Sequence, residues 1–390
     1  MRHVLIILAI FICASATAEI PWNFEALKTA PATYPAPALE AEGVRALFYD
    51  GLPWKGKPTR VFAWFGLPEV PPGEKVPAMV LAHGGGGTAF DEWVRIWTAR
   101  GYAAIAMDLE GTLPKEDYPN RPQHEHSGPH RLGAFEDLAG PPEEQWYYHA
   151  VADIILADSL LRSMPEIDSQ RIGLTGISWG GILSGTVAGV DDRFQFVIPV
   201  YGCGFLDVAP VFTPRWDQLG PEITGRWTTL WDPSTYLPNA KMPMLFVNGA
   251  NDLHFPLNIH TKSYNLVPGP KALSVRVGAG HSHPDGWRPE EIYAYADSFT
   301  RSAVPLPALS VIEMKGDTAN AAIESLSTVE NSVLIYTTDV TDWAKAVWQE
   351  APAAIDGQRI TAAVPPDAKA WFFNLTHSKG LVSSSPVMTR

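Results

Sequence analysis

Cysteine is scarce in this sequence: Cys13 and Cys203 are the only two among its 390 residues. Cys13 lies in an N-terminal segment that we expect to be removed, so Cys203 would be left without a partner. The mature chain would then have no internal disulfide, which excludes a small disulfide-stapled domain. A chain of this length must instead be stabilised by its core, and a hydrophobic content of 46% can supply one.

Positive charge is also in short supply. The chain has 29 lysines and arginines against 42 aspartates and glutamates, a formal net charge of −13. A basic patch could not easily outweigh the negative electrostatic potential of so acidic a chain. We therefore expect no nucleic-acid partner and no anionic membrane surface as a partner. Neutral and cationic small substrates are not excluded.

The apolar run near the N-terminus is too short for a membrane-spanning helix, which needs about 20 residues. It covers residues 4–12, follows Arg2 and His3, and precedes small residues at 14–18. This order is typical of a secretory signal peptide, and we expect cleavage after Ala18. The sequence therefore predicts a signal at residues 1–18 and a periplasmic or secreted product that has no membrane contact once the signal is removed.

The most informative stretch is residues 171–181, where an apolar strand runs into Gly176-Ile-Ser-Trp-Gly180 and a helix follows. The pattern G-x-S-x-G is typical of a nucleophile elbow, a strained turn that exposes a serine hydroxyl above a sheet. Side chains two residues before and after the serine would collide in so tight a turn, hence the glycines. Ser178 is the predicted nucleophile; a tight turn without chemistry is the alternative.

Apolar runs and amphipathic segments alternate around this stretch, which predicts a doubly wound, mostly parallel α/β sheet. In such sheets ligands bind beyond the carboxyl ends of the strands. We expect strands at residues 43–50, 59–67, 78–83, 102–109, 171–177, 194–201, 242–248 and 272–277, and helices at residues 89–100, 143–162, 182–190, 255–266 and 289–302.

Four consecutive glycines, residues 84–87, follow the buried strand that ends at His83. Ordering four glycines costs conformational entropy. Such a run is therefore expected where backbone N–H groups must approach another group closely. Where a nucleophile elbow is present, the oxyanion hole uses the N–H after the nucleophile and a second N–H from this loop. We assign Trp179 and Gly85 as these donors, with Gly86 next in line; a flexible linker is the alternative.

Two further strand ends supply an acid and a base. Asp252 follows the strand at 242–248, and His281 follows Gly278-Ala-Gly280 after the strand at 272–277. The order Ser178, Asp252, His281 is that of hydrolases with this elbow. His283 and, more weakly, His254 are rival bases, and Asp252 could serve only as a helix N-cap.

Long insertions at residues 111–142 and 202–241 are expected to shape the substrate pocket. Trp146, Phe205 and Trp231 are the predicted substrate-binding residues, because their rings could form a wall for a sugar or an aryl acid; packing in the core is the alternative. Crowded imidazoles and one carboxylate at residues 124–130 suggest a metal, but they have no regular ligand spacing. We expect no metal and no cofactor.

The motifs at residues 51–58, 83–87, 176–181, 248–252 and 280–281 resemble those of α/β-hydrolases of the acetyl xylan esterase-like and prolyl oligopeptidase-like kind, related to dienelactone hydrolases. The resemblance covers about residues 43–302. It implies the α/β-hydrolase fold, a Ser-Asp-His triad and hydrolysis through an acyl-enzyme. A serine nucleophile in place of the cysteine of dienelactone hydrolases favours ester or amide hydrolysis.

We therefore expect an α/β-hydrolase catalytic domain with an N-terminal arm at residues 19–302. A small all-β sandwich is expected at residues 303–390, where short strand-like runs are separated by turns. The predicted activity is that of an exported serine esterase acting on a small-molecule or polysaccharide ester. A serine peptidase for short peptides and a non-catalytic carbohydrate-binding protein are the alternatives.

Overall fold

The computed structural model describes residues 21–131, 133, 135–324 and 329–390. The predicted signal peptide at residues 1–18 lies outside the described residues. Within them, no helix has both the length and the apolar character that crossing a membrane requires.

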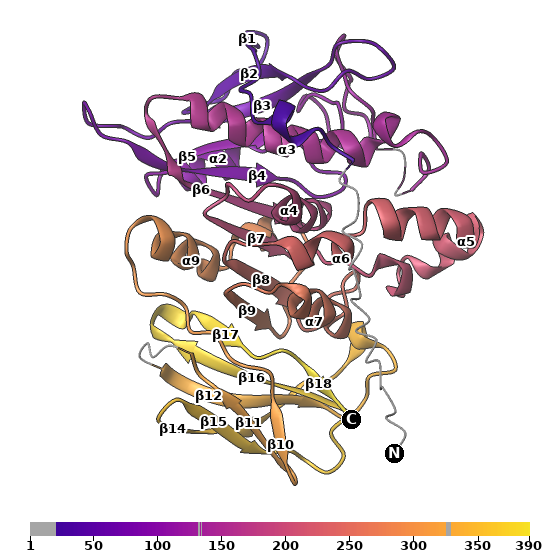
Figure 1. The fold of residues 1–390 in the computed structure, drawn as a ribbon. Helices are drawn as coiled ribbons and strands as arrows, with labels where there is room; N and C mark the ends of the chain where they lie inside the picture. The colour runs from indigo at the N-terminus through magenta and orange to yellow at the C-terminus, as the bar shows by residue number, and fades with distance from the viewer. Residues whose placement is uncertain (1–20, 132, 134, 325–328) are drawn as a thin grey trace, which may run out of the picture.

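A nine-stranded sheet forms the centre of the molecule, in the order β1-β2-β3-β5-β4-β6-β7-β8-β9 (Figure 1). The first three strands pair antiparallel, and β3 also pairs antiparallel with β5, whereas the pairs from β5 to β9 are all parallel. The strands are Thr33–Pro35, Arg45–Asp50, Arg60–Gly66, Val76–Ala82, Ala103–Met107, Ile167–Ile177, Phe196–Val200, Met244–Gly249 and Lys271–Arg276 for β1 to β9. The expected α/β-hydrolase sheet is confirmed.

Helices cover both faces of this sheet, as the alternating pattern predicts. On one face α2 and α9 meet through the rings of Trp97 and Tyr293, 4.8 Å apart. On the other face α3 and α4 are joined by the hydroxyls of Tyr147 and Thr186, 2.9 Å apart. The helices are α1 (Phe24–Leu27), α2 (Asp91–Thr98), α3 (Trp146–Ser163), α4 (Trp179–Val190), α5 (Thr213–Leu230), α6 (Pro233–Tyr236), α7 (Leu257–Leu266), α8 (His283–Trp287) and α9 (Glu290–Thr300).

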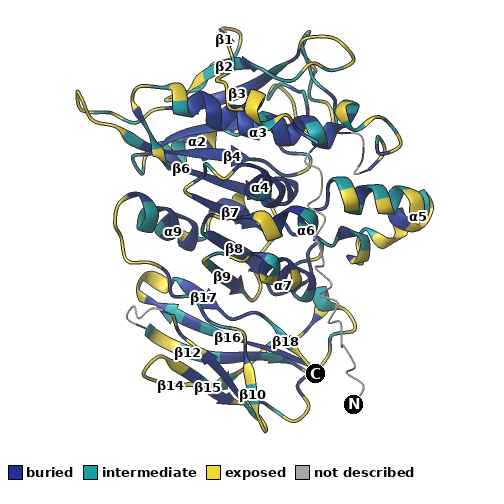
Figure 2. Ribbon diagram, in the orientation of Figure 1, coloured by how far each residue is buried: buried dark blue, intermediate teal, exposed yellow. Residues whose placement is uncertain are grey.

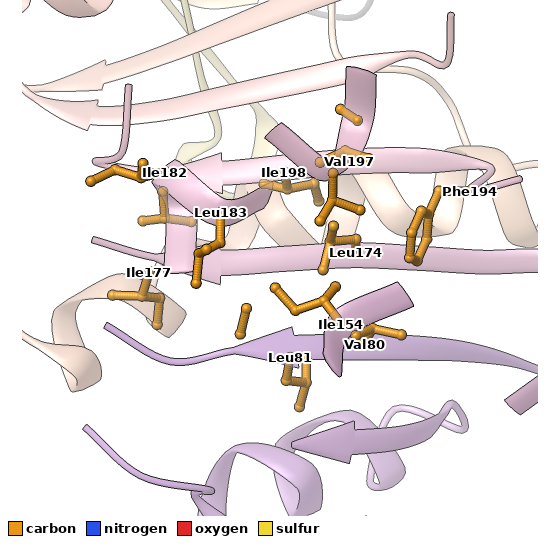
Figure 3. Packing of buried hydrophobic residues seen from close by; sticks show 14 of the residues in the cluster. Val80, Leu81, Ile154, Leu174, Ile177, Ile182, Leu183, Phe194, Val197 and Ile198 are labelled. Atoms are coloured by element: carbon orange, nitrogen blue, oxygen red, sulfur yellow. The ribbon is translucent and has the colours of Figure 1, made fainter. Parts of the chain in front are cut away.

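The central strands read as continuous apolar runs because both of their faces are buried. Figure 3 shows Val80, Leu174 and Val197, from three neighbouring strands, packed with Ile154 of α3 and Leu183 of α4. All five side chains are completely buried. Figure 2 shows the same pattern over the molecule: the inner strands are buried, and exposed residues gather on loops and on outlying elements such as α5.

Residues after α9 form two antiparallel sheets, as expected for the all-β region. One has the order β10-β11-β15-β14 and the other β13-β12-β16-β17, with β18 pairing to β16. Apolar side chains such as Leu334, Ile360 and Phe373 form a buried cluster within this region. The strands are Glu313–Lys315, Thr318–Ala322, Val329–Thr337, Gln349–Pro352, Ala354–Asp356, Arg359–Ala363, Ala370–His377, Val382–Ser384 and Met388–Thr389 for β10 to β18.

The β region packs against the free edge of the central sheet, where β17 lies beside β9 (Figure 1). Two side chains bond to the backbone of one residue in this edge strand: the hydroxyl of Ser384 accepts from the Val275 N–H at 2.8 Å, and the amide of Asn374 donates to the Val275 carbonyl at 3.1 Å. The edge of β9 is therefore covered rather than left open for pairing with another chain.

Candidate active site

Ser178 sits between the end of β6 and the start of α4, with φ 56° and ψ −115°. L-residues rarely adopt a positive φ, so this residue is held in a strained conformation. The flanking glycines make the turn possible. A Cβ on Gly176 would lie 2.1 Å from the Gly180 carbonyl oxygen, and a Cβ on Gly180 would lie 2.0 Å from the Ala82 carbonyl oxygen.

The structure brings Ser178, His281 and Asp252 into one hydrogen-bonded chain at the carboxyl ends of their strands. Ser178 Oγ lies 3.0 Å from His281 Nε2, and His281 Nδ1 lies 2.7 Å from Asp252 Oδ2. Asp252 is buried, and its other oxygen accepts from the N–H groups of His254 and Phe255 at 2.9 and 2.8 Å. A carboxylate held in this way leaves Oδ2 to accept the Nδ1 proton, so Nε2 can accept from the serine hydroxyl.

Of the four N–H groups in the glycine loop, three are engaged and one is free. The Gly84 N–H donates to His283 Nε2 at 3.0 Å, the Gly86 N–H to Glu110 Oε1 at 3.2 Å, and the Gly87 N–H to the Gly84 carbonyl at 3.0 Å. The Gly85 N–H has no acceptor among the described residues. The Trp179 N–H, at the first turn of α4, likewise has none within the described part of the chain. The two assigned oxyanion donors are thus the ones left available for a ligand oxygen.

Side chains from distant parts of the chain hold this loop in place. His83 Nε2 accepts from the Leu109 N–H at 2.9 Å, so its Nδ1 carries the proton and donates to the Gly84 carbonyl at 2.8 Å. Arg121 donates to the Gly86 carbonyl at 2.8 Å and also to the Gly87 carbonyl. Sequence reasoning did not identify Glu110 or Arg121. The available signal was that Glu110 closely follows the carboxyl end of β5, where ligand-facing groups gather.

The rival bases have other surroundings. Burial lowers the pKa of His283 to about 3, so this imidazole is neutral and its Nε2 supports Gly84. Burial and then the charge of His281 lower the pKa of His254, whose ring lies 4.5 Å from that of His281. Ser178 Oγ makes its hydrogen bond to His281 rather than to either of them.

The residues at 124–130 do not converge on a common point. His124 packs on Phe48 with ring centroids 4.8 Å apart, and burial lowers its pKa to about 4. His130 Nδ1 lies 2.9 Å from the Glu110 carbonyl oxygen. Within the described part of the chain, the one set of three metal-ligand side chains that lie close enough together is Asp252, His254 and His281. The hydrogen bonds to Ser178 and between the acid and the base already account for two of these side chains.

A cavity of about 410 Å³ opens beside Ser178, and none of the three predicted substrate-binding residues lines it. Trp146 is 4% exposed and donates to the Leu109 carbonyl at 2.5 Å. Trp231 is completely buried and donates to Gln145 Oε1 at 2.6 Å. Phe205, half-buried, precedes a short 3₁₀ helix and is not among the residues that line this cavity. The prediction that these rings wall the cleft is therefore wrong; the tryptophans pack in the core.

Both insertions nevertheless reach the cavity through other residues. Arg131 comes from the first, and Val211 and Phe212 come from the second. Arg131 and Phe212 were not identified from the sequence, because neither insertion has a periodic pattern from which the direction of a side chain could be read.

The fold and this arrangement define an α/β-hydrolase. The acetyl xylan esterase family model matches residues 39–208, and the prolyl oligopeptidase family model matches residues 136–294. Both are families of hydrolases, which is consistent with serine hydrolase activity.

Individual relatives are distant. The chain is 26% identical over 213 residues to the uncharacterized peptidase YuxL of Bacillus subtilis (strain 168), covering 50% of this chain but only 29% of that relative. Its fold is similar to that of the acetyl xylan esterase from Paenibacillus sp. R4, with a TM-score of 0.57, 21% identity, and coverage of 71% of this chain and 92% of that one. Acetyl xylan esterase 1 from Thermoanaerobacterium sp. JW/SL YS485 gives a TM-score of 0.53, 20% identity, and coverage of 68% and 90%.

Proposed function

We propose that this protein is a serine esterase that hydrolyses carboxylic esters of carbohydrates through an acyl-enzyme. The observation that carries the proposal is the chain from Ser178 Oγ through His281 to Asp252, beside two N–H groups that have no acceptor within the described chain. The match to the acetyl xylan esterase family over residues 39–208 supports an ester as the substrate.

In the proposed mechanism His281 Nε2 takes the Ser178 proton as Oγ attacks the ester carbonyl. The N–H groups of Gly85 and Trp179 stabilise the developing oxyanion, and each such donor contributes about 10²- to 10³-fold in rate. The imidazolium then protonates the leaving alcohol, while Asp252 fixes its tautomer and stabilises its charge. A water molecule activated by His281 releases the acid in the second half of the reaction.

Replacement of the nucleophile tests this proposal. Ser178→Ala removes the attacking oxygen, so hydrolysis of 4-nitrophenyl acetate and release of acetate from acetylated xylan should both fall by at least about 10³-fold. Circular dichroism should show an unchanged fold, because the alanine can keep the same turn. Wild-type activity in this variant would rule out Ser178 as the nucleophile.

A serine peptidase is the second candidate, favoured by the prolyl oligopeptidase family match over residues 136–294. Peptide anilides assayed beside the esters separate the two, because a peptidase should cleave the anilides measurably, whereas an esterase should leave the amide bond intact. Export is also part of the proposal, motivated by the predicted signal at residues 1–18. Cell fractionation of the full-length chain would test it.

A further inference from the structure

Arg131 places a guanidinium in the cavity beside the oxyanion donors. Its Nη2 lies 2.9 Å from the position that a Cβ on Gly85 would occupy. Its guanidinium carbon lies 5.7 Å from the ring of Trp179, the other donor residue. Arg131 and both donor residues line the same cavity as Ser178.

Hydrogen bonds to described residues hold two nitrogens of the Arg131 guanidinium, and the third nitrogen has no acceptor among these residues. Nε donates to Glu110 Oε1 at 2.8 Å, and Nη1 donates to the Gly133 carbonyl. Nη2 has no acceptor in the described part of the chain, although the side chain is only 11% exposed. A guanidinium that is fixed through two of its nitrogens and keeps its third at a cavity is suited to a ligand oxygen.

The charges around this third nitrogen favour an anion. No aspartate or glutamate is among the residues that line the cavity. The Glu110 carboxylate is 3% exposed and is engaged by both the Arg131 Nε and the Gly86 N–H. A second cation, Arg121, donates to the carbonyls of Gly86 and Gly87. Arg131 is thus the one lysine, arginine, aspartate or glutamate among the residues that line the cavity, in a chain with a net charge of −13.

We propose that Arg131 is a specificity residue that binds a carboxylate carried by the substrate. The preferred substrates are then esters that bear a free carboxylate near the scissile bond, such as esters of acidic sugars. This inference rests on the proposed esterase function and narrows its substrate class. A guanidinium matches a carboxylate in shape and forms charge-assisted hydrogen bonds with it.

Two pairs of matched esters test the inference. One pair places the charge on the acyl side: 4-nitrophenyl hydrogen adipate against 4-nitrophenyl hexanoate. The other places it on the leaving group: 4-acetoxybenzoate against 4-acetoxybenzamide. The wild type should prefer the carboxylate by about tenfold or more in kcat/KM in at least one pair. Arg131→Gln should reduce kcat/KM for that anionic ester by about 10- to 100-fold and for its neutral partner by only a few-fold.

Further variants separate charge recognition from support of the loop. Arg131→Lys should keep part of the preference because the charge remains. Glu110→Gln should keep most of it, even if both rates fall, because the glutamine carbonyl can still accept from the Arg131 Nε and hold the guanidinium. Inhibition of the unaltered protein should follow the same preference. If the leaving-group pair shows it, 4-hydroxybenzoate should inhibit more strongly than 4-hydroxybenzamide. If the acyl pair shows it, adipate should inhibit more strongly than adipamide.

Equal losses for the charged and neutral esters in Arg131→Gln, or equal hydrolysis of both by the wild type, would overturn the carboxylate inference and leave the esterase proposal standing. Failure of the wild type to hydrolyse any of the four esters would instead overturn the esterase proposal, and this inference with it.

Discussion

His281 and His283 are two residues apart in the chain, yet the structure gives them different partners. His281 lies between Asp252 and Ser178, whereas His283 accepts the Gly84 N–H that precedes the proposed oxyanion donor. At the residue scale, the hydrogen-bond partners of the ring nitrogens therefore decide which histidine can act as the general base and which one supports the glycine loop.

This difference predicts unequal effects of substitution. His281→Ala should lower kcat by about 10³- to 10⁴-fold, because the general base is lost. His283→Ala should lower it by only about tenfold, because it loosens the glycine loop without removing a reacting group. Steady-state kinetics with 4-nitrophenyl acetate measure both.

His283→Gln provides the control, since a glutamine carbonyl can accept the Gly84 N–H in place of the imidazole. It should recover much of the activity lost in His283→Ala at every pH from 6 to 9. No titration intervenes in that range, because the pKa of His283 is held at about 3. A larger loss in His283→Ala than in His281→Ala would move the base to His283.

At the scale of elements, β6, the turn at Ser178 and α4 pack so closely that two positions allow no side chain. A Cβ on Gly180 would meet the backbone of β4 at the Ala82 carbonyl, 2.0 Å away. Backbone atoms cannot move aside as the end of a flexible side chain can. The close packing of β6 and α4 is thus what exposes the Ser178 hydroxyl above the sheet.

Gly180→Ala should therefore cost at least about 2–3 kcal/mol of unfolding free energy, through forced shifts in β4 or α4. Gly225→Ala is the matched control, because Gly225 lies in α5 and a Cβ there would meet nothing within 4 Å. It should be neutral or stabilise the protein by up to about 1 kcal/mol. Urea unfolding of both variants measures the difference, and equal stabilities would contradict the packing argument.

The elements of the sheet were predictable because burial on both faces leaves a continuous apolar run. The strand expected at residues 78–83 is β4 (Val76–Ala82), and the helix expected at 143–162 is α3 (Trp146–Ser163). The meeting of three strand ends was predictable for the same reason, since parallel strands place their carboxyl ends at one edge.

The insertions were not predictable in this way. Residues 202–241 were expected to be an insertion that shapes the substrate pocket, with no helix assigned to them, and they hold α5 and α6. Gly220, with φ 83°, and Pro221 interrupt the pattern of α5. The direction of Trp231 depends on its bond to Gln145, which precedes α3 and lies 86 residues away, so the sequence around Trp231 carries no signal of it. Arg131 is likewise placed in part by Glu110, which is 21 residues away in the sequence.

At the scale of the whole molecule, the C-terminal β region reaches the loops of both the proposed acid and the proposed base. Asn251, next to Asp252, donates to the carbonyls of Ala346 and Ala344 at 2.8 and 3.3 Å. Arg276, at the end of β9 before the His281 loop, donates to the Gly380 carbonyl at 2.8 Å. The β region thus contacts the chain beside both of the loops that carry Asp252 and His281.

If these contacts keep Asp252 and His281 in position, Asn251→Ala should lower kcat by about 3- to 10-fold. This fall corresponds to the loss of roughly one hydrogen bond. KM should change by less than about twofold. Asn320→Ala is the matched control. The Asn320 amide donates to the Thr318 carbonyl at 3.1 Å and to the Glu313 carbonyl at 3.5 Å, both inside the β region, so its loss should lower stability without lowering kcat. Steady-state kinetics beside urea unfolding measure both quantities for each variant. A kcat for Asn251→Ala equal to that of the wild type, or an equal fall in both variants, would show that the β region covers the edge of β9 without positioning the acid and the base.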